Sequence, residues 1–274
     1  MRLLLTNDDG IHSPGIHALA AHLVAAGHDV TVAAPAQDMS GASAAIGRLH
    51  ADEHIDVTET PVPGTPLVGF AVAGPPGLAA MAACLGAFGA PPEIVVSGIN
   101  AGLNTGHSTL HSGTLGAALT AQNFGTCGVA VSIEPTDPWH WESACEYASS
   151  AIAWLADRAP TRTVLNVNVP GRPRDEIEGV RWAKLDRFGS VRAAVAESGR
   201  NGLQFEFRAT GADLDPDSDT ALVRAGYATL TAVQGVSEVD ITERERPGVR
   251  APDVRRDLRE APGVHRVEIP AAPQ

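Results

Sequence analysis

Two adjacent carboxylates, Asp8 and Asp9, stand where an apolar segment of the chain stops. Residues 3–5 form a continuous apolar run, typical of a strand buried on both faces, and Gly10 follows the carboxylates. Like charges at the end of a buried strand repel each other and cost stability. A bound divalent cation would turn that repulsion into shared coordination. The pair therefore predicts a metal site, although an isolated Asp-Asp-Gly would also fit a solvated turn.

Two further polar segments follow predicted strands and supply oxygen atoms of the same kind. Ser40 comes shortly after the strand predicted over 30–34, and Asn100 follows the strand predicted over 94–96. In open parallel sheets, ligands bind beyond the carboxyl ends of the strands. Carboxylate, hydroxyl and amide oxygens are hard donors, which suit Mg²⁺, Mn²⁺ or Ca²⁺ and disfavour a zinc site. The predicted metal ligands are Asp8, Asp9, Ser40 and Asn100.

A short polar triplet, Ser112-Gly113-Thr114, opens an apolar helix predicted over 113–123. The free N–H groups and the positive dipole end of such a helix start favour phosphate, with an ordinary helix cap as the equally weighted alternative. A metal beside an anion site indicates phosphoryl chemistry, with in-line attack by a metal-activated water that Asp8 or Asp9 orients or deprotonates. Direct attack by a carboxylate, which would form an aspartyl-phosphate, stays open as the other route.

These residues need a scaffold, and the alternation of strands and helices predicts an α/β sandwich with a mostly parallel sheet. From about residue 171 onward Pro, Gly and charged residues dominate. We expect one α/β domain over 1–235, an irregular β-rich insertion over 172–218, and a charged extension over 236–274. The expected strands are 3–5, 30–34, 94–96, 129–133 and 164–169, with short ones near 180–184, 203–208 and 227–232, and the expected helices begin at Ser13-Pro14 and span 77–87, 113–123 and 140–158.

Composition narrows the classes of function. The 274 residues are 44 % hydrophobic, enough for a sizeable core, and contain no apolar run long enough to suggest a membrane span or a signal peptide. The net charge of −12 and the lack of a basic stripe disfavour a nucleic-acid polymer as partner. Three widely spaced cysteines predict no disulfide framework and favour the reducing cytoplasm.

Taken together, the motifs resemble the SurE family, the stationary-phase survival proteins that act as metal-dependent 5′(3′)-nucleotidases. The combination of NDDG, SGIN and SGT in this order is specific, and the matches are spread over most of the chain. The matching segments are 4–15 (LLTNDDGIHSPG), 34–42 (APAQDMSGA), 92–106 (PEIVVSGINAGLNTG), 111–118 (HSGTLGAA), 165–170 (LNVNVP) and 218–231 (SDTALVRAGYATLT).

The resemblance implies a Rossmann-like α/β core, with a β-hairpin and a C-terminal arm that build dimers or tetramers. It implies hydrolysis of nucleoside 5′- and in some members 3′-monophosphates, at times with short polyphosphate as a second substrate, and one divalent cation per subunit. Asp8, Asp9, Ser40 and Asn100 fall where the family has its metal ligands. The residues that fall around the family's phosphate pocket are Gly41, Asn104, Ser112, Gly113 and Thr114.

Some residues depart from the family pattern and leave alternatives open. His111 stands where many members have Tyr, and it is either a proton donor to the leaving alkoxide or a histidine bonded to backbone at the helix entry. The first strand–helix–strand unit also resembles a glycosyltransferase, but about 100 irregular residues after the core cannot supply the second domain such enzymes need. A nucleotide- or metal-binding module without turnover is the non-enzymatic alternative.

Overall fold

The computed structural model of the chain describes residues 1–49, 54–160, 162–187, 189, 191–199, 202–209 and 214–237. Residues Met1–Gly235 form one compact unit. The strands are β1 (Arg2–Thr6), β2 (Asp29–Pro35), β3 (Val57–Pro61), β4 (Val68–Val72), β5 (Ile94–Asn100), β6 (Cys127–Ile133), β7 (Val164–Val169), β8 (Val180–Trp182), β9 (Val191–Gly199), β10 (Gly202–Ala209) and β11 (Ala228–Val233). The helices are α1 (Pro14–Ala25), α2 (Pro76–Cys84), α3 (Gly113–Asn123), α4 (Trp141–Arg158) and α5 (Asp219–Arg224), with 3₁₀ turns η1 (Gly106–His111) and η2 (Arg174–Glu176).

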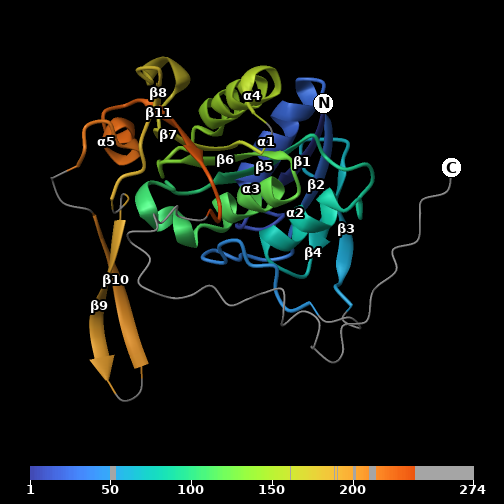
Figure 1. Cartoon of the computed structure of the whole chain (residues 1–274), viewed down its shortest axis with the longest axis horizontal. Helices are drawn as coiled ribbons and strands as arrows, with labels where there is room; N and C mark the ends of the chain where they lie inside the picture. The colour runs from blue at the N-terminus through green and yellow to red at the C-terminus, as the bar shows by residue number, and fades with distance from the viewer. Residues whose placement is uncertain are drawn as a thin grey trace, which may run out of the picture. The chain divides into compact units, whose positions relative to one another are not determined.

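Within the described residues, a nine-stranded sheet in the order β3-β4-β2-β1-β5-β6-β7-β11-β8 forms the centre of the unit (Figure 1). The strands from β4 to β7 in this order are parallel. At the two sides β3 and β11 pair antiparallel with their neighbours β4 and β7, and β8 runs parallel to β11. A mostly parallel sheet flanked by helices confirms the predicted α/β, Rossmann-like fold class.

The order of the strands reverses at the middle of the sheet. From β1 the chain passes to β2 on one side, and later to β5 on the other side, so that β1 lies between them. The loops that leave the carboxyl ends of β1 and β5 therefore part in opposite directions. In open α/β sheets this switch point is where ligands bind.

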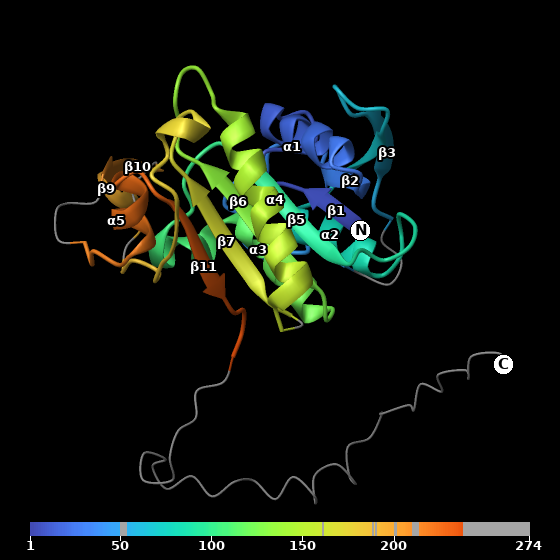
Figure 2. The same ribbon diagram turned by 90° about the horizontal axis from the view of Figure 1, so that it is seen from above.

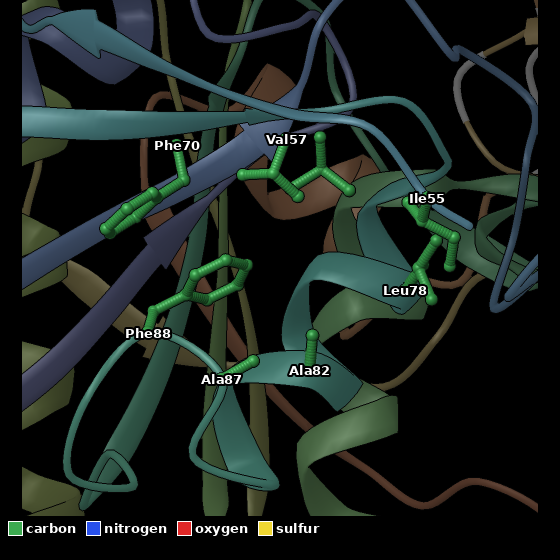
Figure 3. Close-up of a pocket in the computed structure, with 8 residues that line it drawn as sticks. Ile55, Val57, Phe70, Leu78, Ala82, Ala87 and Phe88 are labelled. Atoms are coloured by element: carbon green, nitrogen blue, oxygen red, sulfur yellow. The ribbon is translucent and has the colours of Figure 1, made fainter.

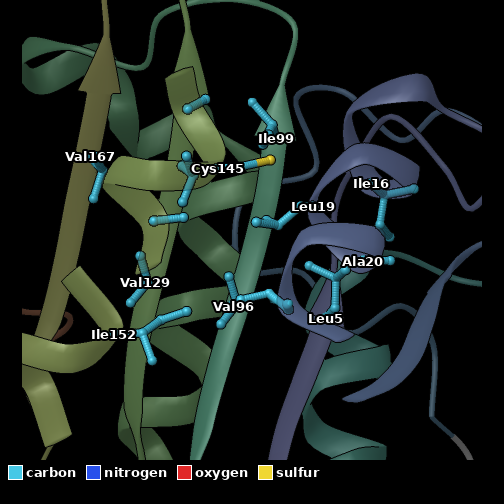
Figure 4. Close-up of a cluster of buried hydrophobic side chains, with 14 of the residues drawn as sticks. Leu5, Ile16, Leu19, Ala20, Val96, Ile99, Val129, Cys145, Ile152 and Val167 are labelled. Carbon is cyan, nitrogen blue, oxygen red and sulfur yellow. The ribbon is translucent and has the colours of Figure 1, made fainter. Parts of the chain in front are cut away.

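Helices cover both faces of the sheet (Figure 2). On one face α1 and α4 contact each other, and α2 and α3 contact each other on the opposite face. The α1/α4 face is packed with apolar side chains, including Leu5, Ile16, Val96, Val129 and Ile152 (Figure 4). This face supplies the main hydrophobic core, because each fully buried aliphatic side chain stabilises the fold by roughly 1.5–3 kcal/mol.

The face beneath α3 is different, because small polar side chains replace apolar ones toward the carboxyl ends of the strands. Thr6, Ser97 and Ser132 come from β1, β5 and β6, and all three are fully buried. Asn166 and Asn168 of β7 are also fully buried, on the same side as Ala130 and Ser132 of the paired strand. A buried polar group costs free energy unless it is hydrogen-bonded, so this polarity marks a site rather than ordinary core.

Several elements differ from the sequence-based expectations. Strands β3 and β4 were not expected, and β9 and β10 form a separate antiparallel hairpin inside the predicted insertion. Strand β8 of the same insertion joins the main sheet. From residue 238 onward, the predicted C-terminal extension lies outside the described residues.

The structure also bears on the expectations for the cysteines and for membrane-spanning segments. All three cysteines are free thiols, and Cys145 is buried in the α1/α4 core. Burial raises the pKa of the Cys145 thiol to about 12, so it stays protonated and packs as a small apolar side chain.

Among the helices in the described part of the chain, not one combines the length and the apolar character that crossing a bilayer requires.

Candidate active site

The Asp8 carboxylate lies at the carboxyl end of β1 and is held by the N-terminus of α3. Only 4 % of the residue is exposed, and its Oδ1 accepts a hydrogen bond of 2.5 Å from the Thr114 hydroxyl. The backbone N–H groups of Gly113 and Thr114 also donate to this carboxylate. Burial raises the pKa of Asp8 above its usual value, while these hydrogen bonds oppose the shift. The positive end of the helix dipole thus stabilises the negative charge of Asp8.

The Asp9 carboxylate is half-buried beside Asp8 and lacks such a partner for one of its oxygens. The backbone N–H of Ala101 donates to it, but its Oδ2 is buried and makes no hydrogen bond within the described part of the chain. Burial, and then the negative charges of Asp8 and Asp38, raise the pKa of Asp9 to about 6. A buried carboxylate oxygen without a donor costs free energy, and a bound cation would remove that cost.

The loop after β2 brings Ser40 toward the carboxylate pair. The N–H of Met39 donates to the backbone carbonyl of Asp8 over 2.8 Å, which ties this loop to the end of β1. The hydroxyl and the N–H of Ser40 both donate to Oδ1 of Asp38, each over 2.7 Å. The hydroxyl proton is thereby occupied, so the lone pairs of the Ser40 oxygen remain available to a cation.

Gly41, in the same loop, has a positive φ of +83°, which favours glycine. Open space surrounds the position where a Cβ would stand. Its backbone N–H makes no hydrogen bond within the described residues. This donor is therefore free for an anion.

Asn100 reaches the same edge from the end of β5. Its Nδ2 donates to the carbonyl of Gly102 over 2.7 Å, which leaves the Oδ1 atom as an acceptor of protons or a ligand of a cation. The next residue, Ala101, is the one whose N–H bonds Asp9. Hydrogen bonds thus join the loops after β1, β2 and β5 at Asp8 and Asp9.

These residues fit a hard divalent cation. The donors are two carboxylates, one hydroxyl and one amide oxygen, the set that Mg²⁺, Mn²⁺ and Ca²⁺ prefer. Within the described residues, no group of three or more His, Cys, Asp or Glu side chains is placed to hold a metal ion. The predicted ligand set itself contains no imidazole or thiolate, the ligands typical of zinc. The buried, unbonded Oδ2 of Asp9 is the observation that favours a bound cation at this edge.

The segment that opens α3 differs in detail from a free phosphate cradle. The Ser112 hydroxyl caps the helix by accepting from the N–H of Leu115 over 3.1 Å. The N–H groups of Gly113 and Thr114 are directed to Asp8 instead of to solvent. The first backbone donors of the helix thus already have partners, and their immediate effect is to fix Asp8. The exposed His111 directly precedes this segment.

Asn104 is held by side chains of β6 and β7 that the sequence motifs do not predict as site residues. Its N–H donates to Oδ1 of Asn168 over 2.8 Å, and its Nδ2 donates to the hydroxyl of Ser132 over 2.9 Å. Its carbonyl accepts from the Nδ2 atoms of both Asn166 and Asn168. The signal was present in the sequence, because two asparagines interrupt an otherwise apolar strand. One hydrogen of the Asn104 amide is left for a ligand.

A separate hollow of about 300 Å³ is not a candidate for this chemistry. It lies between β3, β4 and α2, and its walls are apolar side chains such as Ile55, Phe70, Leu78 and Phe88 (Figure 3). Phe70 and Phe88 stack with ring centroids 4.7 Å apart. The described lining offers neither a charge nor a hydrogen-bonding side chain to a phosphate.

A Rossmann-like fold with two carboxylates at its topological switch point defines a class of α/β proteins that bind their ligands at the carboxyl edge of the sheet. Comparison with known proteins then places the chain within that class. A family model described as "Survival protein SurE" matches residues 3–190. The chain belongs to the SurE family.

Individual relatives agree with this assignment. The chain is 36 % identical over 253 residues to a protein named 5′-nucleotidase SurE from Stenotrophomonas maltophilia (strain K279a), a match that covers 88 % of this chain and 91 % of the relative. It is also 36 % identical over 250 residues to a protein named 5′/3′-nucleotidase SurE from Erwinia tasmaniensis, covering 88 % and 92 %. The crystal structure of the SurE protein from Aquifex aeolicus superposes with a TM-score of 0.70 at 25 % identity, covering 89 % of this chain and 96 % of that one.

Proposed function

We propose that this chain is a metal-dependent phosphomonoesterase that hydrolyses nucleoside 5′-monophosphates, and 3′-monophosphates as well, to nucleoside and phosphate. The observation that carries the proposal is the Asp8–Asp9 pair at the switch point, where one buried carboxylate oxygen is unbonded. Met39 and Ala101, the sequence neighbours of Ser40 and Asn100, hydrogen-bond to this pair. Relatives that share about a third of their residues with this chain are named 5′-nucleotidase and 5′/3′-nucleotidase.

In this proposal Asp8, Asp9, Ser40 and Asn100 hold one divalent cation, which is Mg²⁺, Mn²⁺ or Ca²⁺. When bound, the cation supplies Lewis-acid polarisation of the phosphate and charge stabilisation in the transition state. The contacts from α3 fix Asp8 in one orientation. Asp8 or Asp9 orients or deprotonates the attacking water.

The phosphate group is proposed to lie among Gly41, Asn104, Ser112, Gly113 and Thr114. The free N–H of Gly41 and the remaining amide hydrogen of Asn104 are the direct donors, and both are compatible with a tetrahedral anion approaching the edge of the sheet. The other three residues contribute through the N-terminus of α3, which holds Asp8 and so sets the distance between the cation and the phosphate.

An assay of phosphate release tests the proposal. Purified protein is incubated with a panel of nucleoside 5′- and 3′-monophosphates, with Mg²⁺, Mn²⁺ or Ca²⁺ or with a chelator. We expect release only with a cation, and none from the folded Asp8→Asn and Asp9→Asn variants. The Asp217→Asn variant, which removes an exposed carboxylate elsewhere, should retain activity. Near-native turnover by either site variant would place the chemistry elsewhere.

The same panel separates the remaining possibilities. Cation-dependent thermal stabilisation without turnover would indicate a binding module, and transfer of a sugar in place of phosphate release would indicate a glycosyltransferase. We also propose an exopolyphosphatase activity, and short polyphosphate is added to the substrate panel to test it. A cytoplasmic homodimer or homotetramer is the proposed assembly, and light scattering would measure its mass.

A further inference from the structure

The side chain of Asp219 is a buried carboxylate that the proposed chemistry does not use. It lies at the start of α5, and the residue is 0 % exposed. No ion pair compensates its charge within the described residues. A charge in this position persists only where hydrogen bonds replace its lost hydration.

Three backbone N–H groups supply that compensation, and they come from different parts of the chain. Gly106, in the segment after β5, donates to Oδ2 of Asp219 over 2.8 Å. Asp186, in the segment after β8, donates to Oδ1 over 3.0 Å, and Thr220 of α5 donates to the same oxygen over 2.8 Å. One carboxylate therefore connects three segments that are distant in sequence.

The two outer segments also contact each other directly at this junction. The N–H of His107 donates to the carbonyl of Asp186 over 3.0 Å. A Cβ built on Gly106 would lie 2.2 Å from the backbone nitrogen of Gly189, and both glycines have positive φ. Backbone meets backbone with no room for a side chain, so the position of the Gly106 segment depends on this junction.

The Gly106 segment leads to the candidate active site in both directions. Two residues before it stands Asn104, which is held by β6 and β7. After it, η1 runs to Ser112, the cap of α3, and α3 in turn holds Asp8. Asp219 is thus connected to the site through one short, continuous stretch, residues 104–112.

We propose that Asp219 is a positioning residue that fixes the segment 104–112 and so sets the geometry of the phosphate-binding side of the site. The inference rests on the proposed phosphomonoesterase function. We expect Asp219 to act mainly on substrate binding, because Gly106 is two residues from Asn104, whereas η1 and the start of α3 separate it from the nearest predicted cation ligand, Asp8.

The Asp219→Asn variant tests this inference, since an amide keeps the size of the side chain but can accept on one side only. In phosphate-release assays on the folded variant we expect KM for the nucleoside monophosphate to rise about tenfold, with kcat and the Mn²⁺ dissociation constant changed less than about threefold. The matched Asp217→Asn control removes an exposed carboxylate two residues away and should leave KM unchanged. An unchanged KM in the folded Asp219→Asn variant would refute the proposal.

Amide hydrogen exchange provides a readout that needs no turnover. In the unaltered protein the N–H groups of Gly106 and Asp186 should exchange as slowly as those of β7, and in Asp219→Asn they should exchange about 100-fold faster than core amides do. If Asp219→Asn fails to fold, exchange in the unaltered protein still tests the proposal. Rapid exchange of the Gly106 N–H there would contradict the role of Asp219 in fixing the segment 104–112. Absence of any phosphate release would count against the proposed function, while the exchange pattern would separately support or refute the role of Asp219.

Discussion

The Thr114 hydroxyl is the one side-chain donor to the buried Asp8 carboxylate in the described part of the chain. A hydrogen bond to a charged group contributes about 1.5–3 kcal/mol, and a buried charge that loses a donor bears a desolvation cost. At the scale of single residues, the proposed metal site therefore depends on Thr114, which does not contact the cation itself but holds the cation ligand Asp8.

Replacing Thr114 with Val should lower stability by about 1–3 kcal/mol and weaken Mn²⁺ binding, because Asp8 loses its short hydrogen bond while the shape of the side chain is kept. Thr114→Ser retains the hydroxyl and is the matched control. Urea unfolding and Mn²⁺ titration measure the two effects. Equal stability and equal metal affinity for the Val and Ser variants would contradict the role given to Thr114.

The raised pKa of Asp9 has a consequence for the pH dependence of the metal-free protein. Its folded-state pKa of about 6 lies above the ordinary value of 3.8, so between these values the folded state binds more protons than the unfolded state. Stability should therefore fall as pH rises from about 4 to about 6. Asp9→Asn should lack this contribution and, without metal, be at least as stable as the parent at pH 7. Urea midpoints across this pH range check both statements.

At the scale of elements, the close approach of α3 to β1 depends on glycine. A Cβ on Gly113 would lie 2.7 Å from Cβ of Asp8 and 2.8 Å from its Oδ2, which real side chains cannot tolerate. The helix start and the strand end must separate if that position carries a side chain. The packing of two elements, as well as local capping, thus determines the residue at 113.

Gly113→Ala should consequently destabilise the protein by about 1–3 kcal/mol, the usual cost of overpacking, and reduce activity with it. Gly102→Ala serves as the control for stability, because the atom nearest to its Cβ would be 3.7 Å away. Thermal unfolding of both variants makes the comparison. A Gly113→Ala protein as stable as Gly102→Ala would mean that β1 and α3 are not in close contact.

The elements that place the site could be predicted from the sequence, and those at the sides of the sheet could not. The predicted spans of α3 and β7 agree with the structure to the residue, because each has a continuous hydrophobic pattern and a clear start. Strand β3 is a largely exposed edge strand with polar side chains, so it lacks the buried pattern that identified the central strands. Asp219 was not singled out, because its role depends on contacts with segments distant in sequence.

At the scale of the whole molecule, the predicted ligand residues come from loops after three strands, and they share one edge only when the sheet is folded. A cation that binds this edge must therefore stabilise the folded state over the unfolded chain. Binding of this kind couples the metal site to global unfolding.

Mn²⁺ at about 100 times its dissociation constant should raise the free energy of unfolding by about 2.7 kcal/mol, by mass action alone. A chelator should reverse the effect. The Asp8→Asn and Asp9→Asn proteins should show little or no stabilisation, whereas Asp217→Asn should respond like the parent. Differential scanning calorimetry with and without Mn²⁺ would reveal a shift in the site variants if the cation were bound elsewhere.

The saturated start of α3 also imposes an order of events. Because Asp8 already occupies the amide groups of Gly113 and Thr114, and Asp9 adds a second negative charge, a free anion meets repulsion at this rim. We therefore expect phosphate to bind only after a cation has offset this negative charge. Calorimetric titration with inorganic phosphate should therefore give no heat of binding in chelator, and a measurable one once Mn²⁺ is present.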